Sequence, residues 1–383
     1  MEESIYLDHA AATPVDPRVL SAMLPYYSER FYNPSATYAK AVQVRNDISA
    51  ARQRIAFWLG AQSSEIVFTA GGTEANNLAV QGIMRLHPEG NVVLSPIEHD
   101  SILEPVKRFD NKIVGVLSDG QIDQMSLLSS IDDHTVLVSI MYANNEIGTV
   151  QPIHDIAFAL EKIRVERRKA GNTMPLYLHT DACQAGNYLD IHAARLGVDL
   201  MTLNGGKIYG PKQSGVLYIK RGISLDPLIL GGGQEFNIRS GTENVPASIG
   251  MSVALDLVQT ARKDETKRLK TLQSHFISRL NELGPRVQLN GSSHKRLPNN
   301  IHVTFDGLDN ERLLFDLDTE GILAAAGSAC SASNDEPSHV LRAIGLSDEA
   351  ARSSLRFTMG HETTETMINR TVDALLRIVE NSL

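Results

Sequence analysis

The feature that most constrains the fold is a series of short apolar segments, rich in β-branched residues, between residues 65 and 220. Several are apolar at nearly every position, which is typical of strands that are covered on both faces. The stretch between Thr149 and Gly171 is predicted to be a crossover helix that ends at Gly171. We therefore expect an α/β fold whose large domain has a mostly parallel seven-stranded sheet. The predicted strands are Glu65–Thr69, Asn91–Ser95, Lys112–Leu117, Thr135–Met141, Pro175–Asp181, Val198–Leu203 and Gly215–Lys220.

The pattern changes after Asn244, where a long helical periodicity begins and the Gly284-Pro285 pair predicts its end. Strands and helices then follow one another in a smaller α+β arrangement. We expect a large domain over 13–256 and a small domain built from 1–12 and 257–383. The later predicted elements are a strand Asn299–Phe305, a helix Asn310–Glu320, a small-residue loop over about 324–336, a strand Ser353–Thr358 and a C-terminal helix.

Composition excludes several classes of protein. The net charge of −9 argues against a dedicated nucleic-acid binder, whose surface would be basic. The chain has 2 cysteines, which excludes a disulfide framework, and neither CxxC nor HExxH supports a metal site. We see no signal peptide and no apolar run of about 18 residues that could span a membrane. The expectation is a cytoplasmic protein without direct nucleic-acid or membrane partners.

Phe68–Val80 reads FTAGGTEANNLAV, a strand followed by a glycine turn and a helical pattern. Free backbone N–H groups at a helix N-terminus favour a phosphate. A plain strand-to-helix turn with Thr73 as the N-cap residue explains the same letters. The motif alone leaves both interpretations open.

Two further motifs place ionisable groups after predicted strands. Asp181 ends an apolar strand, where α/β proteins bind ligands, so it is suited either to a protonated ring nitrogen or to capping the next helix. Lys207 follows a strand and two glycines, a setting that suits a Schiff-base nucleophile. Lys212 is the competing lysine, and a solvated loop position is the plain alternative for both.

Cys330 lies in the small-residue run GSACSAS, where nothing bulky would bury it. A thiol in such a loop is placed to react and to be reached by a partner. Cys183 follows an apolar strand, and there we expect a structural, buried cysteine.

These residues occur in motifs that together resemble the cysteine desulfurases, which are fold-type-I pyridoxal-phosphate enzymes. The resemblance runs nearly end to end, and the set in this order is very specific. The motifs are YLDHAAATPVDPRV, NPSATY, FTAGGTEANN, SPIEHDSIL, YANNEIGTVQPI, HTDACQAG, GGKIYGPK, GGGQEFNIRSGTEN, GSACSAS, EPSHVLRAIG and SSLRFTMG.

The resemblance implies a role for each matching residue. Lys207 would hold pyridoxal 5'-phosphate covalently, and Asp181 would keep its ring nitrogen protonated. His99 would stack on the ring and assist proton transfers. Cys330 would attack the sulfur of L-cysteine and carry it as a persulfide, leaving L-alanine.

Other matching positions would complete the cofactor site. Gln184 and Asn145 would bond to the phenolic oxygen of the cofactor. Gly72 and Thr73 would hold its phosphate at a helix N-terminus, with Asn204 beside them.

The remaining matches concern the substrate and the partners. Arg356 would bind the substrate carboxylate, since a guanidinium matches that planar ion, and Asn33 and Asn145 would complete the substrate site. Thr242 would reach the phosphate bound by the other subunit, which implies a homodimer with shared active sites. The longer form of the loop around Cys330 implies delivery of sulfur to an acceptor protein for iron–sulfur cluster assembly or thio-modification.

The sequence departs from the family pattern at a few positions. The family has Ser-x-His before the lysine, where this chain has Asn204, Gly205 and Gly206. We therefore predict weaker anchoring of the phosphate. Tyr38 stands where the family usually has His, and Cys183 where it usually has another residue.

Three alternatives stay open at this point. One is a selenocysteine lyase on the same fold, and another is an aminotransferase, which would not need Cys330. The third is a catalytically degenerate scaffold, prompted by the changes at Asn204 and Gly206. An intact set of catalytic and binding residues argues against this last possibility. The set is Lys207, Asp181, His99, Cys330 and Arg356.

Overall fold

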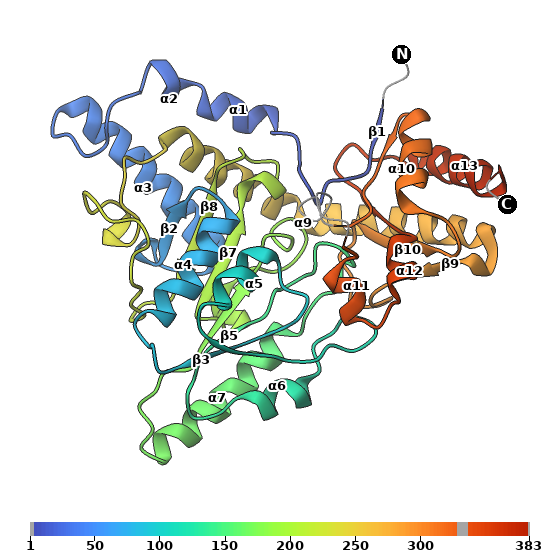
Figure 1. The fold of residues 1–383 in the computed structure, drawn as a ribbon. Coiled ribbons are helices and arrows are strands. Elements are labelled where there is room, and N and C mark those ends of the chain that lie inside the picture. The colour runs from blue at the N-terminus through green and yellow to red at the C-terminus, as the bar shows by residue number, and fades with distance from the viewer. Residues whose placement is uncertain (1–3, 328–335, 382–383) are drawn as a thin grey trace.

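A computed structural model describes residues 4–327 and 336–381, so Cys330 lies outside the described residues. Two lobes are visible (Figure 1), the larger built around a central sheet and the smaller around the C-terminal elements. The short strand β1 (Ile5–Tyr6) and the last helix α13 (Glu365–Asn381) both belong to the small lobe. The small lobe is therefore assembled from both ends of the chain.

Seven strands form the central sheet of the described chain, in the order β2-β8-β7-β6-β5-β3-β4. β8 pairs antiparallel with β2 and β7, and the other pairs are parallel. This confirms the predicted mostly parallel sheet. The strands are β2 (Ile66–Thr69), β3 (Asn91–Leu94), β4 (Asp110–Ile113), β5 (Thr135–Ser139), β6 (Tyr177–Asp181), β7 (Leu200–Asn204) and β8 (Gly215–Ile219).

Helices cover both faces of this sheet. Successive strand residues point to opposite sides, and the apolar side chains on each side pack against helices. Val67 packs with α4 and α5 on one face, whereas Ile66 and Phe68 pack on the other face with α1, α3, α7 and α9. Burial on both sides explains why the strands are almost continuously apolar. The helices of the large lobe are α1 (Pro17–Met23), α2 (Pro25–Ser28), α3 (Ala39–Leu59), α4 (Gly72–Met84), α5 (Asp100–Val106), α6 (Gln124–Ser130), α7 (Ile153–Lys169) and α8 (Ala193–Leu196).

Helix α9 (Val245–Leu280) connects the two lobes. Asn244 caps it, since its side chain accepts a hydrogen bond from the Ala247 N–H at 3.2 Å. The first half of α9 packs in the core of the large lobe and the second half, with Phe276, in that of the small lobe. The α-helix ends before Gly284-Pro285, which lie in a following 3₁₀ segment. Because α9 is continuous, a domain boundary at 256/257 remains a proposal.

The described part of the small lobe contains two short sheets. Antiparallel strands form one of them, in the order β12-β10-β9, and β1 pairs with β11 in parallel to form the other. Their apolar side chains pack with α10, α13 and the end of α9. The elements are β9 (Val287–Leu289), β10 (Asn300–Phe305), β11 (Ile322–Leu323), β12 (Ser354–Thr358), α10 (Asn310–Thr319), α11 (His339–Ala343) and α12 (Asp348–Arg352).

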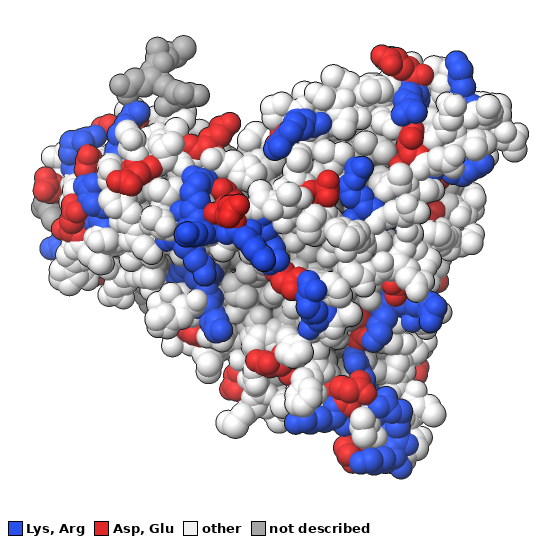
Figure 2. Space-filling model, turned by 180° about the vertical axis from the view of Figure 1, so that it is seen from behind, with Lys and Arg blue, Asp and Glu red and all other residues white. Residues whose placement is uncertain are grey.

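Charged side chains are spread over the surface. On the face seen from behind, a band of basic side chains crosses the middle and has acidic side chains along it (Figure 2). Many such groups form exposed pairs, such as Lys169 with Glu166 at 2.9 Å, and such pairs contribute little to stability. In residues 4–327 and 336–381, no helix combines the length and the apolar character needed to cross a bilayer.

Candidate active site

A cavity of about 230 Å³ lies where the carboxyl ends of the central strands meet the small lobe. Parallel strands bring their carboxyl ends to the same edge of a sheet, which is where open α/β sheets bind ligands. The cavity collects most of the residues that the sequence singled out. Its walls are Ala10, Ala11, Gly72, Thr73, Asn76, His99, Ser101, Met141, Ala143, Asn145, Asp181, Cys183, Gln184, Asn204, Lys207 and Arg356.

Lys207 reaches the cavity from the 3₁₀ turn Gly205–Lys207 that follows β7. Its Nζ donates hydrogen bonds to the carbonyl oxygens of Ala10 and Ala11, at 2.8 and 2.5 Å. Lys212 is not among the residues found in the cavity wall, and its Nζ donates to the carbonyl of Thr13 at 2.6 Å. Of the two candidate lysines, Lys207 is therefore the one that can meet a ligand here.

Asp181 is the last residue of β6, and its side chain is buried. Oδ1 accepts a hydrogen bond from the Cys183 N–H at 2.9 Å, and Oδ2 accepts one from Asn76 Nδ2 at 2.7 Å. The next helix, α8, begins only at Ala193, so the helix-capping interpretation of Asp181 is wrong. Two donors thus hold this carboxylate in place, where it suits a cationic partner.

The cavity also contains the N-terminus of α4. Its N-cap residue is Gly71, with φ at +135°, so the alternative in which Thr73 caps the helix is wrong. A Cβ at Gly72 would lie 2.8 Å from the Cys183 sulfur, so only glycine leaves this space open. The first N–H groups of a 13-residue helix face the cavity here, which favours an anion.

His99 caps α5 and is tied to Asp181 through two side chains. Its Nδ1 accepts the Ser101 N–H at 3.0 Å, which leaves the proton of the neutral ring on Nε2. Ser101 Oγ lies 2.9 Å from the same Nδ1, and Asn76 Nδ2 donates to Ser101 Oγ at 2.8 Å. Asn76 and Ser101 were not predicted as site residues, although both stand in the quoted motifs.

Glu98 is completely buried directly beside His99. Its Oε1 accepts hydrogen bonds from Ser95 Oγ at 2.6 Å and the Met141 N–H at 2.8 Å. Burial, and then the negative charge of Asp181, raise the pKa of Glu98 to about 8. This carboxyl group therefore stays largely protonated at neutral pH and attaches the loop before His99 to the segment that follows β5.

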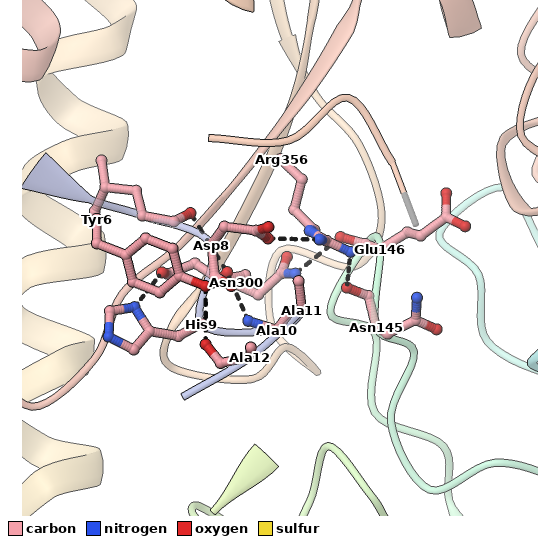
Figure 3. A network of polar contacts seen from close by, with 12 residues as sticks. Tyr6, Asp8, His9, Ala10, Ala11, Ala12, Asn145, Glu146, Asn300 and Arg356 are labelled. Carbon is pink, nitrogen blue, oxygen red and sulfur yellow. Dashed lines mark hydrogen bonds and ion pairs between the residues drawn. The ribbon is translucent and has the colours of Figure 1, made fainter. Parts of the chain in front are cut away.

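Arg356 comes from β12 of the small lobe and is 1% exposed. Its guanidinium donates to Asp8 Oδ1 at 2.7 Å and to the Asn145 carbonyl at 3.1 Å (Figure 3). Its Nε has no hydrogen-bond partner within the described chain. Arg356 therefore places a buried cation at the cavity wall. Asp8 was not predicted as a site residue, although it stands in the first quoted motif.

The remaining predicted residues divide into two groups. Gln184 lines the cavity and donates from Nε2 to the Ala10 carbonyl at 3.0 Å. Asn204 Oδ1 accepts the Gly206 N–H at 3.0 Å. Asn33 and Thr242 are exposed and do not appear among the cavity residues, so a single described chain does not bring them to this site.

Cys183 lines the cavity, whereas we had expected only a structural position for it. Burial raises the pKa of its thiol well above the ordinary value, and the charge of Asp181 acts in the same direction. The thiol is therefore protonated, which makes it a poor nucleophile. Cys330 stays the predicted nucleophile, and it lies outside the described residues.

Taken together, the cavity offers one amine, a buried carboxylate, a helix N-terminus and a buried guanidinium. These groups fit pyridoxal phosphate: Lys207 for its aldehyde, Asp181 for its ring nitrogen, and Gly72 and Thr73 for its phosphate. The space that a Cβ at Gly72 would fill supports this fit.

Comparisons with known proteins agree with this site. The family model "Aminotransferase class-V" matches residues 5–370. Cysteine desulfurase IscS of Dictyoglomus turgidum is 41% identical over 99% of this chain and 95% of its own length.

Solved structures are similar over the same length. A NifS-like protein from Rickettsia africae has a TM-score of 0.88 at 31% identity and covers 99% of this chain and 100% of its own. A structure titled "SspA in complex with cysteine" has a TM-score of 0.79 at 35% identity and covers 93% and 99%. The chain belongs to the class-V aminotransferase family, and within it to the cysteine desulfurase group.

Proposed function

We propose that this protein is a pyridoxal-phosphate-dependent cysteine desulfurase. It takes the sulfur atom from L-cysteine and leaves L-alanine and a persulfide on Cys330. The observation that carries the proposal is the convergence of Lys207, Asp181, the α4 N-terminus and Arg356 on one cavity. The full-length similarity to proteins named cysteine desulfurase supports the same reaction.

The cofactor residues would act as follows. When bound, pyridoxal phosphate supplies an electron sink that stabilises negative charge at the substrate Cα. Asp181 would keep the ring nitrogen of the cofactor protonated, because Asn76 and Cys183 hold its carboxylate in place. His99 presents a proton on Nε2 for transfer near the substrate.

Substrate binding would depend on Arg356. A guanidinium that is 1% exposed interacts strongly with a carboxylate, because water does not screen the pair. Arg356 lines the cavity, so a carboxylate bound there would meet this cation. The change at Gly206 does not remove any of these groups, so no observation favours a degenerate scaffold.

The sulfur step uses Cys330. Its thiolate attacks the substrate sulfur, the carbon–sulfur bond breaks, and the carbon gains a proton to give L-alanine. The sulfur remains on Cys330 as a persulfide and passes to an acceptor protein. We propose a cluster scaffold or a thiolation protein as acceptor, and the cytoplasm as the place where this occurs.

A homodimer with shared sites is part of the proposal. Exposed apolar side chains on α2, on α3 and after β8 support it, among them Tyr27, Phe57 and Leu230. Within a dimer, Thr242 of one subunit would complete the site of the other, and Asn33 would reach substrate in the same way. Sedimentation equilibrium should give twice the chain mass.

The test is a product assay. The enzyme is incubated with L-cysteine and a reductant, and sulfide and alanine are measured beside Cys330→Ser and Lys207→Ala. We expect equal amounts of both products from the parent, and neither product at the parental rate from the variants. Sulfide at parental rate from Cys330→Ser would exclude Cys330 as nucleophile, and pyruvate with ammonia in place of alanine would indicate a lyase.

A further inference from the structure

The side chain of Glu146 lies between the two described ends of the chain that flank residues 328–335. Glu146 is 1% exposed, so its carboxylate needs a partner to offset the loss of water. That partner is Ser338, whose Oγ donates to Glu146 Oε2 at 2.6 Å. On the other side, a Cβ at Gly327 would lie 3.4 Å from the same oxygen. The Glu146 carboxylate is thus bonded to the downstream flank and lies close to the upstream one.

Ser338 also caps a helix, so the contact with Glu146 fixes the start of that helix. Its Oγ accepts the N–H groups of Val340 and Leu341 at 3.1 and 3.3 Å, which makes it the N-cap of α11. His339 adds a second attachment, because its Nε2 lies 3.0 Å from the carbonyl oxygen of Glu98. The start of α11 is therefore fixed to two loops of the cavity wall.

The upstream flank is fixed beside the substrate-binding residue. Ala325 and Arg356 form an isolated β-bridge, with the Arg356 N–H donating to the Ala325 carbonyl at 2.6 Å. The backbone of Glu146 is itself held, since its N–H donates to Asn144 Oδ1 and its carbonyl accepts from Asn300 Nδ2, both at 2.8 Å. Figure 3 shows the Glu146 side chain pointing away from Arg356. Glu146 therefore has a fixed backbone, and within the described residues its carboxylate accepts a hydrogen bond from Ser338.

We propose that Glu146 and Ser338 are positioning residues that set where the segment carrying Cys330 begins and ends relative to the cavity. This inference rests on the proposed function, because the segment matters only if Cys330 receives sulfur. Neither residue lines the cavity. Their loss should slow sulfur transfer to Cys330 and leave the binding of L-cysteine intact.

The test separates these two steps in the holoenzyme. Rapid mixing with L-cysteine reports substrate binding through the visible absorbance of the cofactor, and quenched samples analysed by mass spectrometry report sulfur on Cys330. We expect Ser338→Ala and Glu146→Ala to lower the transfer rate by about tenfold, the effect of one charge-assisted hydrogen bond. The absorbance change should keep its parental rate.

The matched control is Ser347→Ala. Ser347 caps α12 as Ser338 caps α11, with its Oγ accepting the Ala350 N–H at 3.1 Å. It should leave both rates unchanged. The double variant of Glu146 and Ser338 should be no slower than the slower single variant, because the carboxylate and the hydroxyl share one contact.

Two results would overturn the inference. One is a transfer rate in Ser338→Ala equal to that in Ser347→Ala, and the other is an equal slowing of the absorbance change and of the transfer. A parent enzyme that never places sulfur on Cys330 would refute the proposed function itself, and the inference would fall with it.

Discussion

Asp8→Asn should destabilise the protein by removing the ionic partner of a buried cation. Asp8 Oδ1 lies 2.7 Å from the Arg356 guanidinium, although the two residues stand near opposite ends of the chain. The Arg356 side chain is 1% exposed and that of Asp8 is 19% exposed. In the variant the guanidinium keeps its bond to the Asn145 carbonyl at 3.1 Å but loses its counter-charge. The substitution therefore leaves a buried charge uncompensated.

The magnitude follows from burial. Breaking a fully buried ion pair by removing one partner costs about 3–5 kcal/mol, and the partial exposure of Asp8 lowers the expected loss to about 2–4 kcal/mol. An exposed pair contributes about 0–1 kcal/mol. Arg377 and Glu320 form such a pair at 3.0 Å, with side chains 56% and 45% exposed. Glu320→Gln is thus a matched control in the same lobe.

Urea unfolding followed by circular dichroism measures both variants. We expect a clearly lower midpoint for Asp8→Asn and an almost unchanged one for Glu320→Gln. Adding Arg356→Met to Asp8→Asn should recover part of the stability, because the unpaired charge is then gone. Equal free energies of unfolding for Asp8→Asn and Glu320→Gln would refute the reasoning.

Three further changes test the cavity and the core. Gly72→Ala should weaken binding of added pyridoxal phosphate, because its Cβ would lie 2.8 Å from the Cys183 sulfur; adding Cys183→Ala should restore it, and parental affinity in the single variant would contradict this crowding. Gly206→His should tighten that binding by about tenfold, and its Cβ has room because the nearest atom is 3.5 Å away; an unchanged titration of apo-protein would show that a side chain here does not help. His302→Gln should reduce the sensitivity of stability to acid, because burial, helped by nearby arginines, lowers the pKa of His302 from 6.5 to about 3. Between these pH values the unfolded chain binds a proton that the folded protein does not, so the parent should lose up to about 1.4 kcal/mol per pH unit as the pH falls; urea midpoints that fall equally in both proteins would contradict this.

The sheet could be predicted because its strands are buried on both faces and so read as continuous apolar runs. The ends of the elements were less certain. The third strand was expected over Lys112–Leu117, but β4 covers Asp110–Ile113, since pairing with β3 fixes its register from Asp110. That strand lies at the sheet edge and is polar, so hydrophobicity alone placed it too late.

Lys207, Asp181 and the α4 N-terminus could be predicted because they stand at a strand end or a glycine turn, whereas Arg356 lies inside β12 and was predicted from the family resemblance alone. Their supporting contacts could not, because they join segments that are far apart in the sequence. Asp8 meets Arg356, Asn76 meets Asp181, and Ser338 meets Glu146 only after folding. No local periodicity encodes these contacts, and the motifs quoted for the family give the letters without the pairings.

The central claim is that sulfur moves from L-cysteine to Cys330 in a cavity organised around Lys207. The most direct test incubates the holoenzyme with L-cysteine in the absence of reductant and maps the peptides by mass spectrometry. The account predicts one added sulfur atom on the Cys330 peptide, an equal amount of alanine, and neither in Lys207→Ala. Sulfur found on Cys183, or none on either cysteine, would contradict it.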